Sequence, residues 1–388
     1  MAVISILSGF AAMVVAIKIL KKVQWALLVA IFFTALMAFR LDYIFSSFVL
    51  TVKQPNFYEV LGVIYGIYLI ADTMKKSGNS KKFADSIKEI FNSKQSMALM
   101  PMMLGLLPMP GGAMFTAPMV RDIGDENKID RLTSATVNYW FRHSMEFFWI
   151  LYPAMVIYSA LSGITLTRLL LLHLPIGIVG IVSGWFYYKI GKFEINHNLT
   201  NWKNLVISLI PIFTIMIGVV AGIPGWLVVI TVSLIYSFYY KNLKGIINIK
   251  WEVFLLLLFV FWYKNFIESS NLSVDFVRQL QDINLNPWWI IIISPLIIGL
   301  ITGITQAAFS ITMPIAITLA SAELVSLVPA AISTYYFSVI GVLFSPVHLC
   351  LLLSGEFFEV KMGKIAKKMI VPLIFCTIMY GIIFYITL

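Results

Sequence analysis

Hydrophobic and polar positions alternate on a coarse scale, as long apolar runs separated by short polar stretches. Crossing a bilayer takes about 20 mainly apolar residues, so each long run predicts a membrane helix. In the first half the pattern predicts helices at about 2–18, 25–44 and 57–73, a Lys-rich amphipathic stretch at 81–91, a long segment at 131–160 and a helix at 167–189. The first apolar run lacks the layout of a cleaved signal peptide, so we expect it to be retained.

The run at 95–120 differs from the others because prolines and glycines interrupt it. Its breakers are Pro101, Pro108, Pro110, Gly111, Gly112 and Pro118. Proline removes a backbone donor and clashes with the preceding turn, so no straight helix can continue through this run. We expect a re-entrant hairpin that enters and leaves the membrane on one side. A pair of kinked full crossings, with proline and glycine serving only helix packing, is the alternative.

The second half repeats this order of elements. It predicts helices at about 203–221, 224–240 and 251–267, an amphipathic stretch at 273–283, a broken run at 287–319, a long segment at 324–353 and a helix at 365–387. Pro101 and Pro295 are separated by the same interval as Gly105 and Gly299. Such self-similarity indicates a duplicated segment.

A hairpin adds no net crossing, so each half crosses the membrane an odd number of times and the second half is expected to be inverted. The predicted fold is an all-α polytopic membrane protein with two inverted repeats. Each repeat has three helices, a re-entrant hairpin, a broken helix and a final helix. The predicted boundaries are 1–194 for the first repeat and 195–388 for the second.

Composition supports a membrane protein, since 60% of residues are hydrophobic and 12% charged, against about 25% charged in soluble domains. Soluble enzyme folds are thereby excluded. With both termini outside, most of the 28 Lys and Arg fall in predicted cytoplasmic loops, as expected for a multi-pass membrane protein. This bias accounts for the net charge of +10, so no nucleic-acid partner is expected. Cys350 and Cys376 lie in apolar runs, and we expect buried spectators, without a disulfide or a metal site.

The two broken runs predict a polar site. Irregular backbone survives at membrane depth only where protein or a water-filled cavity shields it. The second helix of each hairpin would point free N–H groups and a partial positive charge at its tip, which suits an anion. The candidate substrate-binding residues at the tips are Pro110, Gly111 and Gly112 in the first run, and Thr305, Gln306 and Ser310 in the second.

Two charged residues fall inside the long segment that starts at Arg131. A rise of 1.5 Å per residue places Arg142 and Glu146 about 16 and 22 Å along it, near mid-membrane. A charge there costs about 2.5 to 3.5 kcal/mol, so each is a functional candidate. At four residues apart they could form a structural ion pair; alternatively, Arg142 meets a substrate carboxylate and Glu146 takes a proton or a cation. Asn138 precedes Arg142 by one turn on the same face and joins the substrate-binding candidates.

The matching segment of the second half carries Ser338, Ser345 and Pro346. Pro346 should interrupt the helix and expose carbonyls that could coordinate Na⁺. Ser338, Ser345 and Glu146 are therefore the ion-coupling candidates. We expect no cofactor, apart from Na⁺ if it is the coupling ion. His143 is expected to be a packed polar residue and His348 to lie at a solvated helix end.

The element order, with the sequences LPMPGGA at 107–113, NYWFRH at 138–143 and SPVHLC at 345–350, resembles the ion transporter superfamily. It is most similar to an uncharacterised prokaryotic family of roughly ten-helix proteins near the gluconate permeases. The resemblance implies a homodimer in the inner (plasma) membrane of a prokaryote that works as an elevator. It implies that the first three helices of each repeat are scaffold helices (scaffold 1–94 and 195–286), that 95–194 and 287–388 form the moving transport part, and that the amphipathic stretches are connecting arms. Divalent-anion symporters carry Ser-Asn-Thr at both hairpin tips and this sequence does not, so dicarboxylate specificity is not implied.

These observations predict a secondary active transporter of a small carboxylate-bearing anion, coupled to Na⁺ or H⁺, in the lipid bilayer. A channel or a lipid flippase on the same scaffold is the alternative. An intramembrane enzyme is least expected, because no HExxH zinc pair, nucleophilic serine with a facing histidine, or aspartate pair is recognisable. No nucleotide-binding loop occurs either, so we expect neither an enzyme nor an ATP-driven pump.

Overall fold

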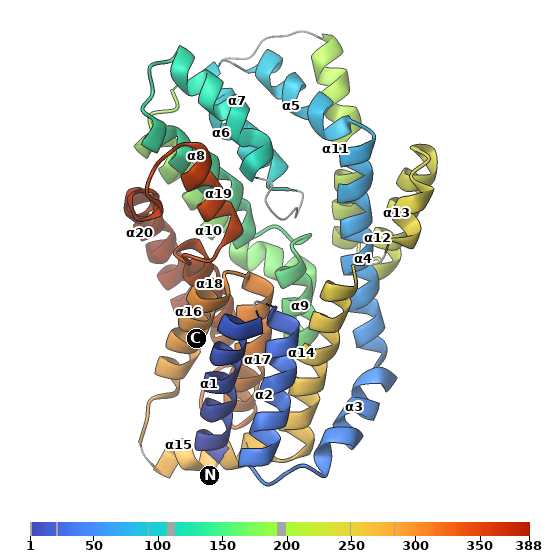
Figure 1. The fold of residues 1–388 in the computed structure, drawn as a ribbon, viewed down its shortest axis with the longest axis vertical. Coiled ribbons are helices and arrows are strands. Elements are labelled where there is room, and N and C mark those ends of the chain that lie inside the picture. The colour runs from blue at the N-terminus through green and yellow to red at the C-terminus, as the bar shows by residue number, and fades with distance from the viewer. Residues whose placement is uncertain are drawn as a thin grey trace.

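The computed structural model describes residues 2–20, 22–91, 93–106, 113–191, 199–248, 250–282 and 284–388. These residues form helices and connecting turns, with no β-strand among them (Figure 1). Six of the described helices are long and apolar enough to cross a membrane, with spans at 2–20, 55–76, 166–187, 201–220, 243–269 and 362–387. The prediction of an all-α, multi-pass membrane protein is confirmed.

The first half folds into ten α-helices and one 3₁₀ turn within its described residues. They are α1 (Ala2–Leu20), α2 (Val23–Met37), α3 (Tyr43–Lys53), α4 (Pro55–Lys76), α5 (Asn79–Ile90), α6 (Ser93–Leu104), α7 (Ala113–Glu126), α8 (Arg131–Ser144), η1 (Met145–Phe147), α9 (Pro153–Ser162) and α10 (Leu166–Tyr187).

The described residues of the second half form α11 (Leu199–Val220), α12 (Gly225–Tyr239), α13 (Leu243–Ile247), α14 (Trp251–Ser269), α15 (Leu272–Asp282), α16 (Pro287–Thr302), α17 (Thr305–Ser321), α18 (Leu327–Leu343), α19 (Leu349–Phe357) and α20 (Met362–Thr387). The amphipathic stretches predicted at 81–91 and 273–283 are the helices α5 and α15.

One predicted helix differs from the structure. The run at 25–44 was expected to be continuous, but α2 ends at Met37. Phe39 adopts a left-handed backbone with φ 55°, a conformation that a helix cannot contain. The chain therefore turns there, and a separate helix, α3, follows it.

Both proline-rich runs are split into two short helices that pack against each other, α6 with α7 and α16 with α17. The helices have 12, 14, 16 and 17 residues. At 1.5 Å per residue they are about 18 to 26 Å long, whereas the hydrocarbon core is about 30 Å thick. Each helix alone is therefore shorter than a full perpendicular crossing.

A second pattern common to both halves is a close approach between the first helix of the broken run and the long helix after it. A Cβ added at Gly105, directly after the last residue of α6, would lie 2.6 Å from the carbonyl oxygen of Arg142 in α8. A Cβ at Gly299 of α16 would lie 2.7 Å from the carbonyl oxygen of Ser338 in α18. Only glycine allows these two backbones to come so close.

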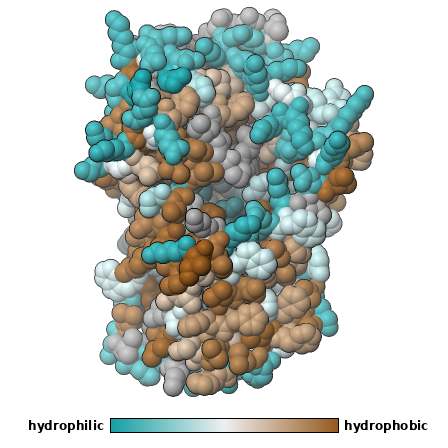
Figure 2. Space-filling view, in the orientation of Figure 1, coloured by the Kyte–Doolittle hydropathy of each residue, from teal (hydrophilic) through white to brown (hydrophobic). Residues whose placement is uncertain are grey.

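The two halves are interleaved and do not form separate lobes. α14 packs on α2 and α3, α12 on α4, α11 on α5, and α20 on α10. Figure 1 shows α1, α2 and α14 together at the lower end of the view, and α5, α6 and α7 at the upper end. Hydrophilic residues gather over that upper end, whereas hydrophobic residues cover the face over α1 and α2 (Figure 2). α17 packs on α9 and α18 on η1, so the second broken run and the helix after it contact the segment that follows the first broken run.

Candidate functional site

Helix α8 carries the polar residues predicted from the first half. Asp130 caps its N-terminus by accepting a hydrogen bond of 2.9 Å from the backbone N–H of Thr133, which fixes where the helix begins. Asn138 is fully buried and Arg142 is 3% exposed. Pro110, Gly111 and Gly112, predicted at the first tip, lie outside the described residues.

Asn138 and Arg142 hold the two helices of the first broken run. The Asn138 amide donates to the carbonyl of Ala113, the first residue of α7, at 3.0 Å, and accepts from the Thr116 hydroxyl at 2.5 Å. The Arg142 guanidinium donates to the carbonyl of Leu104, the last residue of α6, at 3.4 Å. A buried cation on the last carbonyl of a helix compensates its negative end. Both side chains therefore position the segment whose tip was predicted to bind substrate.

The spacing of four residues predicted that Glu146 and Arg142 share a helical face, but in the structure they do not. Helix α8 ends at Ser144, and Glu146 sits in the 3₁₀ turn η1. No ion pair joins the two side chains in the described part of the chain. The Glu146 carboxylate, 7% exposed, instead accepts a hydrogen bond of 2.5 Å from the hydroxyl of Thr305. A buried carboxylate needs such donors because its desolvation is costly.

Thr305 is the first residue of α17, directly after the break in the second run. The preceding helix α16 ends at Thr302 and is capped by Gly303, which has a left-handed backbone with φ 65°. The contact between Glu146 and Thr305 therefore joins the end of α8 in the first half to the start of α17 in the second. Two residues predicted from separate halves, one as ion-coupling and one as substrate-binding, are brought into direct contact.

The other candidates of the second half differ in their surroundings. Ser345 donates to the carbonyl of Leu300 in α16 at 2.7 Å, so it holds that helix as Arg142 holds α6. Ser338 donates to the carbonyl of Thr334 within its own helix. The hydroxyl of Ser310 is buried and has no hydrogen-bond partner among the described residues, whereas Gln306 is half-buried.

Two tyrosines join the halves reciprocally. Tyr139 of α8 donates to the carbonyl of Leu343 in α18 at 3.1 Å. Tyr335 of α18 donates to the carbonyl of Glu146 in η1 at 2.8 Å. Both side chains are fully buried. Each half thus supplies the donor for one bond and the acceptor for the other.

Sequence reasoning missed a cluster of two histidines and a cysteine. His143 and His348, expected to be a packed polar residue and a solvated helix end, face each other with their Nε2 atoms 3.0 Å apart. Cys350, expected to be a spectator, has its sulfur in the same group, where the ligand atoms lie within 4.8 Å of one another. The short spacing of His348 and Cys350 was the only local signal, because His143 lies in the other half of the chain.

Asp130 lies at the N-terminus of α8, outside the candidate membrane spans, and its surroundings lower the pKa of its carboxyl. Partial burial raises the pKa of this carboxyl, but the hydrogen bonds from Thr133 and the charge of Lys368 outweigh that effect, so the pKa lies below its ordinary value. The charged form is therefore the one that the fold stabilises.

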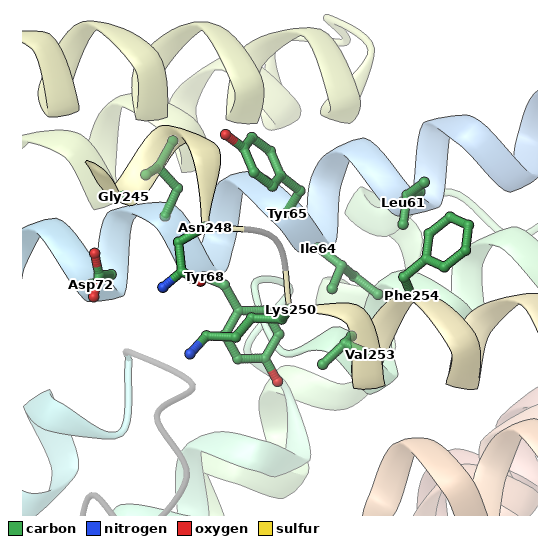
Figure 3. A pocket seen from close by; sticks show the side chains of 11 residues that line it. Leu61, Ile64, Tyr65, Tyr68, Asp72, Gly245, Asn248, Lys250, Val253 and Phe254 are labelled. Carbon is green, nitrogen blue, oxygen red and sulfur yellow. The ribbon is translucent and has the colours of Figure 1, made fainter. Parts of the chain in front are cut away.

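A small pocket lies away from these residues, between α4 and the α13–α14 region (Figure 3). Phe254 and Leu61 stand at one end and Asp72 at the other, with Lys250 between them (Figure 3). Its volume of about 40 Å³ holds only a few water molecules. Asp72 is already paired with Lys76 at 2.7 Å. The pocket is therefore a weaker candidate for a substrate site than the buried residues around Glu146 and Thr305.

Comparison with solved structures gave a structural neighbour that covers most of the chain. The YdaH transporter of Alcanivorax borkumensis, whose crystal structure is described as having an unusual topology, matches with a TM-score of 0.64 at 12% sequence identity. The match covers 89% of this chain and 88% of that one. At this identity the likeness concerns the fold. A search of the curated proteins gave no match.

A family profile matches nearly the whole chain, and the description of that family names no activity. The matched residues are 2–387, so both halves of the chain fall within the match. The chain therefore belongs to the family described as "Protein of unknown function (DUF401)".

Proposed function

We propose that this protein is a secondary active transporter of a small anion that carries a carboxylate. The observation that carries the proposal is the buried contact between Glu146 and Thr305, beside the buried Arg142, where helix ends from both halves meet. Ionisable side chains inside a membrane protein are costly and mark substrate or ion pathways. The fold shared with the YdaH transporter supports the same function.

The arrangement favours an anion as substrate. Thr305 begins α17 without a side-chain cap on the preceding residue, so the first N–H groups of this helix suit a carboxylate. The hydroxyl of Ser310 faces no described hydrogen-bond partner and is a further donor for such a ligand. In the proposed cycle Glu146 takes up H⁺ or helps to bind Na⁺, and neutralising its charge releases Thr305 to the substrate.

Inverted repeats and an elevator movement complete the proposal, as does membership of the ion transporter superfamily. The matched glycine contacts of α6 with α8 and α16 with α18, and the reciprocal bonds of Tyr139 and Tyr335, support two related halves. In this scheme the broken runs and the helices after them move as one body. The scaffold helices hold a homodimer in the bilayer, and α5 and α15 act as the connecting arms.

The test is uptake into proteoliposomes after a thermal-shift screen of carboxylates with and without Na⁺. Glu146→Gln removes the titratable charge but keeps a hydrogen-bond acceptor for Thr305. We expect this variant to retain substrate exchange and to lose its dependence on the pH or Na⁺ gradient. Arg142→Lys should weaken uptake of the anion, whereas Arg131→Ala, on an exposed arginine paired with Glu359, should not.

Two results would contradict the proposal. Uptake that does not saturate with substrate concentration would indicate a pore. Gradient-driven uptake by Glu146→Gln at the wild-type level would remove Glu146 from coupling.

A further inference from the structure

The cluster of His143, His348 and Cys350 has a hydrogen-bond arrangement that two neutral imidazoles alone do not explain. Nδ1 of His143 lies 2.8 Å from the carbonyl oxygen of Tyr139, and Nδ1 of His348 lies 2.8 Å from that of Gly303. A carbonyl oxygen only accepts, so each Nδ1 carries the ring hydrogen. Each neutral ring therefore presents an unprotonated Nε2.

These two Nε2 atoms are 3.0 Å apart. Two lone pairs facing each other at that distance repel, and a shared cation removes the repulsion. The third group, the sulfur of Cys350, lies within 4.8 Å of the nitrogens. His143 and Cys350 are 4% and 5% exposed, whereas His348 is half-buried and leaves a path for an ion to enter.

We propose that His143 Nε2, His348 Nε2 and Cys350 Sγ bind one divalent transition-metal ion of the Zn²⁺ type. Zinc prefers nitrogen and sulfur ligands, with Zn–N of about 2.0 to 2.1 Å and Zn–S of about 2.3 Å. Tetrahedral geometry at those bond lengths puts two nitrogens about 3.3 Å apart, so the rings need to separate by only a few tenths of an ångström. Three protein ligands leave a fourth position for water or an anion.

The orientation of the histidines supports a metal over a chance contact. Histidines that bind metals usually donate the other ring N–H to a carbonyl or carboxylate, which fixes the tautomer and the ring orientation. Both histidines meet this condition here, His143 with the carbonyl of Tyr139 in its own helix and His348 with that of Gly303 at the C-terminal cap of α16. Gly303 is required for this contact, since a Cβ there would lie 2.9 Å from the backbone nitrogen of His348.

Such a metal site would connect the two halves at their centre. His143 lies in the last turn of α8, His348 caps α19, and Cys350 lies in its first turn. The ion would therefore fix the end of α8 against the start of α19, next to the end of α16. This inference concerns binding alone and does not depend on the proposed transport.

The test uses the full chain, purified in detergent, freed of its affinity tag and stripped of metal. We expect it to bind a single equivalent of Zn²⁺ by calorimetry and by elemental analysis. With Co²⁺ in place of Zn²⁺, bonding to Cys350 should produce a thiolate-to-cobalt charge-transfer absorption. Cys350→Ser should abolish that band and weaken Zn²⁺ binding by more than about tenfold.

Cys376→Ser is the matched control, because Cys376 is the other buried cysteine and its thiol faces the carbonyl of Ile176 at 3.8 Å, away from the cluster. It should bind both metals as the wild type does. His348→Gln, checked for an unchanged elution volume, provides a second variant in case Cys350→Ser does not fold, and it should also lose binding. The proposal is overturned if the wild-type chain binds no stoichiometric metal, or if Cys350→Ser keeps the affinity and the sulfur band.

Discussion

Replacing Gly299 by alanine tests the close contact between α16 and α18. The added methyl group would lie 2.7 Å from the carbonyl oxygen of Ser338 and 3.1 Å from both the Cα of Gly341 and the nitrogen of Val342. All three atoms belong to the backbone of α18, so no side chain can rotate away. The two helices would have to move apart by about half an ångström or more, since packed atoms in protein interiors tolerate little overlap.

The size of the effect follows from two opposing contributions. Overpacking a tight contact costs about 1 to 3 kcal/mol, and the upper part of that range applies where only backbone can yield. Alanine recovers about 1 kcal/mol through its higher helix propensity. Gly299→Ala should therefore lower the free energy of unfolding by about 1 to 2 kcal/mol.

Gly381 in α20 is the matched control, since an added Cβ there meets nothing within 4 Å. Only the gain in helix propensity remains, so Gly381→Ala should stabilise the protein by up to about 1 kcal/mol. The two variants should then differ by about 2 to 3 kcal/mol, or roughly 30- to 150-fold in the unfolding equilibrium.

The assay is equilibrium unfolding in mixed micelles, followed by circular dichroism and by a second probe such as tryptophan fluorescence. The midpoint should fall for Gly299→Ala and hold or rise for Gly381→Ala. If Gly299→Ala shifts the midpoint in the same direction and by the same amount as Gly381→Ala, the backbone contact of α16 and α18 does not limit the packing.

Three further outcomes are expected. Thr305→Val removes the donor to the Glu146 carboxylate and should cost about 1.5 to 3 kcal/mol; an unchanged unfolding midpoint would show that this hydrogen bond is absent in solution. Ser345→Ala removes the hydroxyl that donates to the Leu300 carbonyl, so the free energy of unfolding measured in mixed micelles should fall by about 1 kcal/mol. Asp130 has a lowered pKa, so its charge should stabilise the wild type over Asp130→Asn above about pH 4, and this difference in thermal midpoint should disappear as the pH falls through the lowered pKa. A pH-independent difference would contradict the last expectation.

Much of the helix order could be predicted from the sequence, because apolar length and proline position are local signals. The proline-rich runs at 95–120 and 287–319 are both split helices. The end of α2 at Met37 was missed because no proline or glycine marks it. Phe39, where the chain turns, is a residue type that rarely adopts a left-handed backbone, so its identity gives no local signal for the turn.

The contacts among the candidate residues were predicted less completely than the helices, for a different reason. Glu146 and Thr305, which are hydrogen-bonded in the structure, could be singled out from the sequence because each is a polar residue in an apolar run. The prediction that Arg142 and Glu146 share a helical face was wrong, because α8 changes to a 3₁₀ turn after Ser144. The pairing of His143 with His348 depends on how the two halves pack, and no local pattern contains that information.

The reciprocal bonds of Tyr139 and Tyr335 have a consequence for biogenesis. Each phenol is buried and, among the described residues, donates its hydrogen bond to a carbonyl of the other half; an unsatisfied hydroxyl in such a place costs about 1 to 3 kcal/mol. Neither half can complete its interior until the other has been synthesised and inserted. A polypeptide stopped at the midpoint should therefore remain a target for membrane quality-control proteases, and supplying the missing half as a separate chain should protect both.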